Sequence, residues 1–242
     1  MSKQICVFQH IDVEHPGIFR DFLKQDGVSY VPVELDTGEP IPDLSQFDAL
    51  WVMGGPMDTW QEAEHPWLID EKAAIRHAVR DLKLPYLGFC LGHQLLADAL
   101  GGRIGLSVNP EIGILDVNTV SNIESPFLKD IPATIKSLQW HSAEVQLAPE
   151  DCQVLMQSPD CAVQAISYGD HAFSVQFHVE LTEHTVKEWG EIPEYRNALN
   201  KSLGEGAMDH MIKNADANMA DFNRLSRQLY DNWCTASGFK NS

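Results

Sequence analysis

The sequence predicts an α/β fold in which a mostly parallel central sheet carries helices on both faces, with a small antiparallel strand region and a C-terminal helical tail. Three observations predict it. Short apolar runs alternate with segments of helical character through residue 100, which is typical of βαβ units. From residue 103 to about 177 the apolar runs are short and turns are frequent. From about residue 207 to 233, apolar residues recur every three or four positions.

The N-terminal part of the chain supplies the parallel strands and the helices that connect them. Four apolar runs bounded by polar or turn residues are predicted as strands: residues 4–9, 29–34, 47–53 and 84–89. Three segments are predicted as helices: residues 16–24, 66–82 and 91–100. Pro66 opens the second helix, and Gly101-Gly102 ends the third. This alternation predicts helices on both faces of a parallel sheet.

The region that follows is predicted to lead the chain back to the sheet through short strands, several of them antiparallel. The candidates are residues 112–117, 135–139, 154–156, 162–166 and 172–177. The last of them is predicted as a buried strand that runs directly into His178.

Two segments complete the chain. The tail, about residues 207–234, is predicted as one helix whose apolar stripe docks onto the domain, with a homodimer contact as the alternative. The segment from Trp189 to Gly206 contains turn residues and has no clear period, so it is expected to be a loop or lid near the site.

Length and composition indicate a single domain over residues 1–242, with a core over about residues 4–190. At 242 residues, 44% of them hydrophobic, the chain can bury a full core. The start, Met1-Ser2-Lys3-Gln4, has no signal-peptide pattern, and no apolar run approaches the roughly 20 residues of a membrane helix. The five cysteines are odd in number and form no C-x-x-C, which fits a reducing compartment, so a cytoplasmic protein is expected.

The net charge is strongly negative, −18 at pH 7. Such a charge repels phosphate backbones and anionic lipids, so neither nucleic acid nor a membrane is expected as a partner. It does not exclude a zwitterionic small molecule, because exposed charges more than about 8 Å away are largely screened at physiological salt.

The junction Gly88-Phe89-Cys90-Leu91-Gly92 is the most informative stretch of the chain. It follows a predicted strand and precedes a predicted helix, as in the G-x-S-x-G nucleophile elbow, where flanking glycines let backbone pass where side chains would collide. Cys90 then lies at a helix N-terminus, where unpaired amides and the helix dipole favour the reactive thiolate. The alternative is that Cys90 is a small buried hydrophobic residue, the usual fate of a free cysteine.

A cysteine nucleophile needs an oriented base and donors for the oxyanion. His178 and Glu180 lie two apart on an extended segment, so their side chains point the same way and Glu180 can hold the imidazole in one tautomer. The third predicted strand ends in Gly54-Gly55-Pro56, whose amides can face a developing negative charge. Since sites in parallel sheets form beyond the carboxyl ends of strands, Gly55, Cys90 and His178 are predicted to meet.

Neither a metal nor a cofactor is expected. His178-Val179-Glu180 has the form of a partial metal site, but no second close-spaced His/Cys/Asp cluster partners it in the sequence. The other nine histidines are mostly expected to be ordinary core or surface residues: His10, His15, His65, His77, His93, His141, His171, His184 and His210.

These motifs, in this order and spacing, make the chain resemble the class I glutamine amidotransferases, a family that uses a Cys-His-Glu group to remove the amide of glutamine. The resemblance covers about residues 4–190 and implies a flavodoxin-like sheet. The matching segments are Gly54-Gly55-Pro56, Gly88 to Gln94, Trp140-His141-Ser142 and Phe177 to Glu180.

The resemblance implies a catalytic role for three residues. Cys90 is implied as the nucleophile, His178 as the general base and acid, and Glu180 as the carboxylate that orients the histidine. Members of the family usually carry proline between the histidine and the glutamate, and Val179 stands there in this chain. Valine also keeps an extended backbone, so the two side chains can still align.

The resemblance also implies which groups bind the substrate. Backbone amides of Gly55 and Leu91 would form the oxyanion hole. Gln94 and the backbone near Trp140 and His141 would hold the α-amino and α-carboxylate groups of a glutamine or γ-glutamyl substrate.

The predicted function is hydrolysis of the γ-amide of glutamine or of a γ-glutamyl compound by a free-standing protein. The long tail and the loop from Gly55 to Trp60 resemble those of free-standing members. Because the chain has no G-x-x-x-x-G-K nucleotide loop, a synthetase fed with ammonia would be a separate protein, which is the first alternative. The second is a non-catalytic redox-sensing or binding module in which Cys90 is oxidised reversibly, although a sensor does not need an aligned His178 and Glu180.

Overall fold

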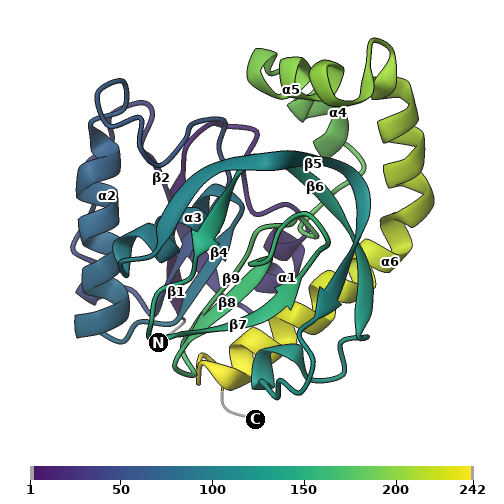
Figure 1. Cartoon of the computed structure of the whole chain (residues 1–242). Coiled ribbons are helices and arrows are strands. Elements are labelled where there is room, and N and C mark those ends of the chain that lie inside the picture. The colour runs from purple at the N-terminus through teal and green to yellow at the C-terminus, as the bar shows by residue number, and fades with distance from the viewer. Residues whose placement is uncertain (1–2, 241–242) are drawn as a thin grey trace.

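One mixed sheet forms the centre of the computed structural model, which describes residues 3–240 (Figure 1). The outer ends of the predicted domain, residues 1–2 and 241–242, lie outside the described residues. The parallel strands are β1 (Gln4–Gln9), β2 (Ser29–Glu34), β3 (Ala49–Val52), β4 (Tyr86–Phe89) and β9 (Ala172–Val175). The antiparallel strands are β5 (Arg103–Thr119), β6 (Thr134–Leu147), β7 (Cys152–Gln157) and β8 (Ala165–Tyr168). Their order is β2-β1-β3-β4-β9-β8-β7-β5-β6.

The parallel half of the sheet follows the prediction closely. β1 and β2 begin and end where the sequence predicts them, and β3 and β4 are shorter than predicted. Every strand of this half is buried on both faces except the edge strand β2. That burial explains why these strands are continuous apolar runs that can be recognised from the sequence.

The predicted strand 172–177 is wrong at its end, because β9 stops at Val175. The chain then leaves β4, and Gln176 donates from its backbone to Gln164. His178 forms an isolated antiparallel bridge with Leu138 of β6, with N···O distances of 2.8 and 3.2 Å. His178 therefore does not follow directly after a strand of the parallel half, and two backbone hydrogen bonds to β6 hold it instead.

The antiparallel half is larger than the small region that the sequence predicts. β5 has 17 residues and β6 has 14, and together they form a long curved ribbon that arches from α3 (Leu91–Ala99) towards α6 (Ala207–Ala236) (Figure 1). The predicted strands 112–117 and 135–139 are its central parts. The register shifts between Leu106 and Glu111, and much of β5 is exposed, so its ends carry no apolar run that would reveal them.

Helices cover both faces of the sheet. On one face, α1 (Phe19–Gln25) and α6 pack against β1, β3, β4 and β9. On the other, α2 (Trp67–Arg76) and α3 pack against the same strands, and α2 continues into a π-helical turn, His77–Asp81. The fold is thus the predicted α/β arrangement, in which β3 leads into the Gly54-Gly55 turn and β4 leads through Cys90 into α3.

The sequence analysis expected residues 189–206 to be a loop or lid near the site. The expected loop is wrong, because most of this segment is helical. α4 (Thr185–Trp189) is followed by α5 (Pro193–Leu203), which has proline at its first turn. Only Tyr195 and Leu199 of α5 are buried, one turn apart, so its apolar stripe is too narrow to show a helical period. α4, α5 and the first half of α6 form a third apolar cluster against β5 and β6.

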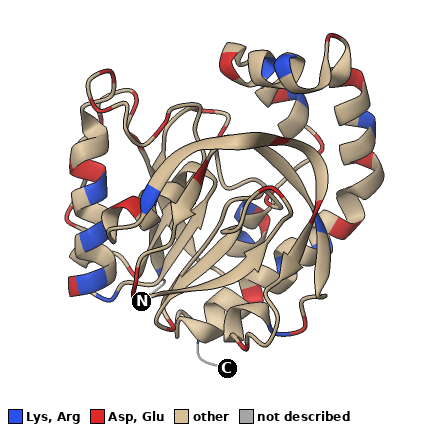
Figure 2. Cartoon of the chain, in the orientation of Figure 1, with Lys and Arg blue, Asp and Glu red and all other residues tan. Residues whose placement is uncertain are grey.

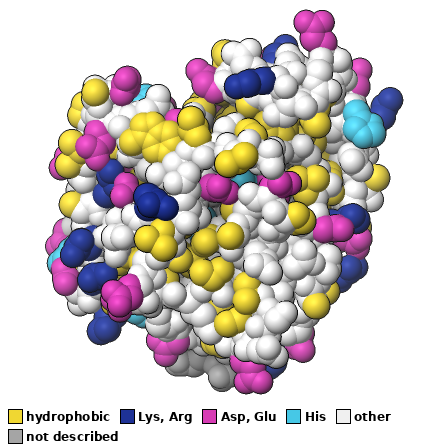
Figure 3. Space-filling view, viewed as in Figure 1, with side chains coloured by type: hydrophobic (Ala, Val, Ile, Leu, Met, Phe, Trp, Pro, Cys, Tyr) yellow, Lys and Arg dark blue, Asp and Glu magenta, His cyan; other side chains and the backbone are white. Residues whose placement is uncertain are grey.

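The surface shows mixed charge and several exposed apolar side chains. Acidic and basic residues are interspersed along the helices (Figure 2). Leu106, Val108 and Leu147 of the β5–β6 ribbon are exposed, and hydrophobic side chains are scattered over this face (Figure 3). Over residues 3–240, none of the helices has the length and apolar character needed to cross a membrane.

Candidate active site

Cys90 lies at the turn between β4 and α3 in a strained backbone conformation. Its φ and ψ angles are 49° and −103°, a region that costs a non-glycine residue on the order of 1–3 kcal/mol. Its amide donates to the Val175 carbonyl at 2.9 Å, which anchors the turn to β9. The flanking glycines are sterically required, since a Cβ at Gly92 would lie 2.1 Å from the Val52 carbonyl oxygen and one at Gly88 would lie 2.8 Å from the Gly92 oxygen. This geometry is that of a nucleophile elbow.

His178 and Glu180 form a buried pair. Nδ1 of His178 is 2.6 Å from Oε1 of Glu180, and Oε2 of Glu180 accepts from the Val179 amide at 2.9 Å. The His178 ring also meets the Trp189 ring edge-on, with centroids 4.5 Å apart. The carboxylate, the peptide amide and the indole together fix the orientation of the imidazole.

The electrostatic surroundings of His178 favour its protonated form. Burial acts to lower its pKa, but the charges of Glu180 and Cys90 and hydrogen bonds to both side chains outweigh burial. The pKa of His178 is therefore held well above its ordinary range. Glu180, which contacts Nδ1, and the Cys90 thiol are thus the two partners that stabilise the protonated imidazole.

Gly55 and Leu91 lie together at the mouth of the elbow. A Cβ at Gly55 would come within 2.9 Å of Cδ2 of Leu91, so the glycine turn packs directly on the first turn of α3. Leu91 is the first residue of that helix, where the helix itself offers its amide no acceptor. In the part of the chain that the structure describes, the Gly55 amide has no hydrogen-bond partner either. Both amides are thus free to receive an acceptor from outside.

Gln94 is held in place beside Cys90 by two hydrogen bonds. Its Nε2 donates to the Ala143 carbonyl at 3.0 Å and to Oε1 of Gln176 at 3.1 Å. Nε2 of Gln176 in turn lies 3.6 Å from the Cys90 sulfur. Gln176 is a neighbour of the thiol that sequence analysis missed, because nothing in the strand pattern around it marks it.

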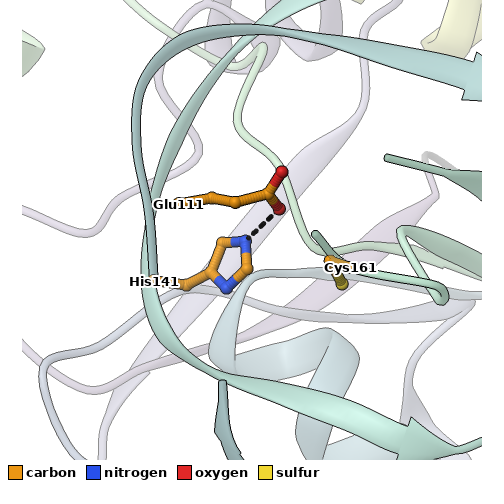
Figure 4. Close-up of side chains that lie close together, drawn as sticks. All are labelled: Glu111, His141 and Cys161. Carbon is orange, nitrogen blue, oxygen red and sulfur yellow. Dashed lines mark hydrogen bonds and ion pairs between the residues drawn. The ribbon is translucent and has the colours of Figure 1, made fainter. Parts of the chain in front are cut away.

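The side chains of Trp140 and His141 are hydrogen-bonded to other parts of the chain. Trp140 donates from Nε1 to the Tyr195 carbonyl at 3.1 Å, which ties β6 to α5. His141 is bound at both ring nitrogens. Nε2 lies 3.1 Å from Oε2 of Glu111 (Figure 4), and Nδ1 lies 2.9 Å from the Ala143 carbonyl oxygen. Because both nitrogens are occupied, the imidazole of His141 has no free nitrogen for a ligand.

A small pocket unites most of these groups. Its volume is about 170 Å³, below the roughly 300–1,000 Å³ of sites for drug-sized ligands, so it suits a small substrate. Cys90 and the predicted residues Gly55, Leu91, Gln94, Trp140 and His141 all line it, together with Tyr195 of α5. His178 and Glu180 do not line it and lie behind the sulfur.

Glu14 is a buried carboxylate at the site that sequence analysis missed. It accepts a hydrogen bond from the Tyr195 hydroxyl, while its Oε2 has no partner among the described residues. Its ligand atoms lie within 4.8 Å of those of His178 and Glu180. Burial raises the pKa of Glu14 to about 7, against the attraction of His178. No sequence signal reveals Glu14, because the loop that carries it has no regular period.

Among residues 3–240, two groups of side chains have the composition of metal ligands. One is the pair His178 and Glu180 with Glu14, and the other is Glu111, His141 and Cys161 (Figure 4). In the second group Glu111 Oε2 already accepts from His141 and, at 2.6 Å, from the side chain of Gln164. Hydrogen bonds therefore account for this cluster, which the sequence spacing had not revealed.

Comparisons with known proteins give consistent results. A family model described as glutamine amidotransferase class-I matches residues 18–188. One subunit of GMP synthase (glutamine-hydrolyzing) from Sulfolobus acidocaldarius is 34% identical, over 68% of this chain and 82% of that protein. Gamma-glutamyl peptidase 3 of Arabidopsis thaliana is 28% identical, over 60% of this chain and 59% of its own length.

A solved structure extends the similarity to nearly the whole chain. The structure of a glutamine amidotransferase from Methylobacillus flagellatus superposes with a TM-score of 0.86 at 27% identity, and covers 98% of this chain and 96% of that one. The similarity thus includes α6 and the helices before it, beyond the residues that the family model matches.

Proposed function

Given that this chain belongs to the class I glutamine amidotransferase family, we propose that it hydrolyses the γ-amide of glutamine or of a γ-glutamyl compound through a thioester on Cys90. One observation carries this proposal. The strained elbow cysteine lines a small pocket together with two free backbone amides, and the buried His178–Glu180 pair interacts with that cysteine from outside the pocket. A thiol, an oriented base and oxyanion donors are the parts that acyl transfer to cysteine requires.

In the first half-reaction the Cys90 thiolate attacks the γ-carbonyl carbon, and the electron pair of the carbonyl moves onto its oxygen. The amides of Gly55 and Leu91 donate to this oxyanion, and loss of one such donor typically costs about 10²- to 10³-fold in rate. The His178 imidazolium then gives its proton to the leaving nitrogen as the C–N bond breaks. Ammonia or an amine leaves, and a glutamyl thioester remains on Cys90.

In the second half-reaction water attacks the thioester. Neutral His178 takes a proton from the water, the C–S bond breaks, and glutamate leaves. The thiolate and the imidazolium are restored. The raised pKa of His178 supports this cycle, because it favours the imidazolium that each turnover needs at its start.

The substrate is expected to lie with its amino-acid end against the β6 segment. Residues Trp140 to Ala143 line the pocket, and the polar atoms of the Trp140 and His141 side chains are hydrogen-bonded elsewhere. Gln94, fixed by Ala143 and Gln176, would contact the α-substituents of the substrate from α3. Because the pocket is small, it would accept a single glutamyl group.

Two physiological roles are compatible with this chemistry. A free-standing hydrolase is supported by the match to a solved glutamine amidotransferase over nearly the whole chain and by relatives named gamma-glutamyl peptidases. Delivery of ammonia to a separate synthetase is the second candidate, favoured by the name of the 34% identical relative, which is a subunit of GMP synthase. We place the free-standing role first.

The test assays the purified chain against glutamine and a panel of γ-glutamyl peptides, with Cys90→Ala as the matched control. We expect release of ammonia or amine that depends on Cys90, and labelling of Cys90 by diazo-oxo-norleucine that excess glutamine blocks. Activity that appears only when cell extract is added would favour the synthetase-linked role. An unchanged rate in Cys90→Ala would exclude the proposed chemistry, and labelling that ignores glutamine would favour a redox sensor.

A further inference from the structure

We propose that a second buried histidine–glutamate pair, His10 and Glu71, is a positioning device that aims the Gly55 amide into the oxyanion hole. This inference rests on the proposed function, since it assigns a task to residues that support the same site. His10 is the residue after β1, and Glu71 lies on α2. Neither touches the pocket, so they would act through the Gly54–Gly55 peptide between them and the substrate.

The sheet register brings His10 beside Gly54. β1 and β3 are parallel neighbours in which Phe8 pairs with Val52. His10 and Gly54 each lie two residues beyond these partners, so they face each other. Nδ1 of His10 lies 2.8 Å from the Gly54 carbonyl oxygen, and Nε2 lies 2.8 Å from Oε1 of Glu71. Both side chains of the pair have no exposed surface. The register of β1 against β3 and the burial of the pair therefore hold His10 in contact with Gly54.

The partners define the protonation of the ring. A carbonyl oxygen can only accept, so Nδ1 of His10 carries a hydrogen. A carboxylate on the other side favours a hydrogen on Nε2 as well. Burial acts to lower the pKa of His10, but the charge and hydrogen bond of Glu71 outweigh it and raise the pKa. A charged donor makes a stronger hydrogen bond to the Gly54 carbonyl than a neutral one.

Fixing the Gly54 carbonyl also fixes the Gly55 amide. The described residues contain no cis peptide bond, and in a trans peptide the C=O and the N–H point in opposite directions. Since the Gly54 oxygen points at His10, the Gly55 N–H points away from it. Gly55 lines the pocket beside Cys90 and Leu91, and its amide has no partner among the described residues. The hydrogen bond from His10 thereby aims this donor at the place where the oxyanion forms.

The pair is locked by α2. Trp67 and Glu71 lie one turn apart on this helix, and the Trp67 ring stacks on His10 at 5.5 Å with an interplanar angle of 19°. The glycine turn packs closely on His10, because a Cβ at Gly55 would come within 2.9 Å of Cβ of His10. This packing explains why a helix remote from the substrate matters for the peptide, since two glycines in sequence would otherwise be free to rotate.

The experiment compares two replacements of His10. His10→Leu has similar bulk and no donor, whereas His10→Asn can place an amide N–H near the former Nδ1. We expect kcat for γ-glutamyl hydrolysis to fall about 10²- to 10³-fold in His10→Leu, as for loss of one oxyanion donor, with KM changed less than about threefold. His10→Asn should restore kcat to within about tenfold of the wild-type value. Glu71→Gln, which keeps an acceptor for Nε2, should cost about threefold to tenfold and serves if His10→Leu does not fold.

Two further readouts separate positioning from damage. The rate of Cys90 alkylation by iodoacetamide needs the thiolate but no oxyanion hole, so it should match the wild type in every variant. Crystal structures of the wild type and His10→Leu should show the Gly54–Gly55 peptide rotated in the variant. A peptide that keeps its orientation without His10, equal kcat values for the Leu and Asn variants, or a parallel fall in alkylation would each overturn the proposal. A wild type inactive on every γ-glutamyl substrate would refute the proposed function, and the peptide orientation would still decide the role of His10.

Discussion

Two of the buried histidine–glutamate pairs of this protein, His178–Glu180 and His10–Glu71, have nearly the same internal geometry and very different surroundings. Nitrogen and carboxylate oxygen are 2.6 Å apart in His178–Glu180 and 2.8 Å apart in His10–Glu71, and both histidines have a raised pKa. The other side of the His178 ring interacts with a thiol, whereas the other nitrogen of His10 faces a peptide carbonyl. The proposed roles differ accordingly, since His178 would move a proton and His10 would only hold a peptide.

The difference shows that a buried ion pair does not by itself identify a catalytic base. The third partner decides the role, because a thiol can exchange a proton with the ring and a carbonyl oxygen cannot. This criterion also classifies the third pair, His141–Glu111, in which the second ring nitrogen is bound to the Ala143 carbonyl at 2.9 Å. It belongs with His10–Glu71 as a support of backbone.

The largest contrast in kcat should come from replacing His178 and His10, one at a time, with asparagine. His178→Asn removes the proton carrier, so we expect kcat to fall about 10⁴-fold, the upper range for general acid–base catalysis. His10→Asn keeps a donor for the Gly54 carbonyl, so its loss should stay below about tenfold. Steady-state hydrolysis of a γ-glutamyl anilide measures both. Similar losses at the two positions would remove the distinction between the pairs.

Replacing Glu180 and Glu71, one at a time, with glutamine should give a smaller contrast in kcat. Glu180→Gln leaves His178 with a wrong tautomer or orientation and lowers the proton affinity of the ring, so kcat should fall about 10²-fold or more. The matching change at Glu71 should cost no more than about tenfold, since the Nδ1 donor persists. The pH profile of kcat/KM should shift in Glu180→Gln and remain in place in Glu71→Gln. A shifted profile in both variants would contradict this assignment.

Glu111→Gln should affect binding more than chemistry. Loss of the charge beside His141 loosens the segment from Trp140 to Ala143, which lines the pocket. We expect KM to rise about threefold to tenfold with kcat little changed, the pattern of lost uniform binding. A fall in kcat at constant KM would instead place Glu111 with the proton-transfer pair.

We expect Glu14 to change how the free energy of unfolding depends on pH. Burial raises its pKa in the folded protein from the ordinary 4.5 to about 7, so the folded state binds this proton more tightly than the unfolded state. The resulting stabilisation is complete below about pH 4.5 and is lost as the pH rises through about 7, a total on the order of 1–3 kcal/mol. Glu14→Gln, which still accepts from Tyr195, should be more stable than the wild type at pH 8 and similar at pH 5. Parallel urea-denaturation curves at both pH values would contradict this expectation.

The sequence was sufficient for features that depend on local pattern. The buried parallel strands are continuous apolar runs, and the glycines around Cys90 are spaced as an elbow requires, so both could be predicted. His178 and Glu180 are two residues apart, which made their pairing predictable as well. The half-exposed β5 and the narrow stripe of α5 lack such patterns, and there the predictions were too short or wrong.

Features that depend on tertiary packing could not be predicted. Glu14 and His10 lie in the loop after β1, and Glu71 lies on α2. Each is an ordinary acidic or histidine residue in its local context, so only the register of β1 against β3 and the packing of α2 give it a role. The histidines expected to be ordinary core or surface residues include two of the three that form these buried pairs.

The most direct test is to trap the covalent intermediate. The protein is mixed with a γ-glutamyl substrate, quenched in acid within the first turnover, digested and examined by mass spectrometry, with His178→Asn treated in parallel. We predict a glutamyl adduct on the peptide that contains Cys90, absent from the peptides of the other four cysteines and formed far more slowly in the variant. Substrate hydrolysis with no adduct at Cys90, or an adduct that forms equally fast without His178, would contradict the proposed chemistry.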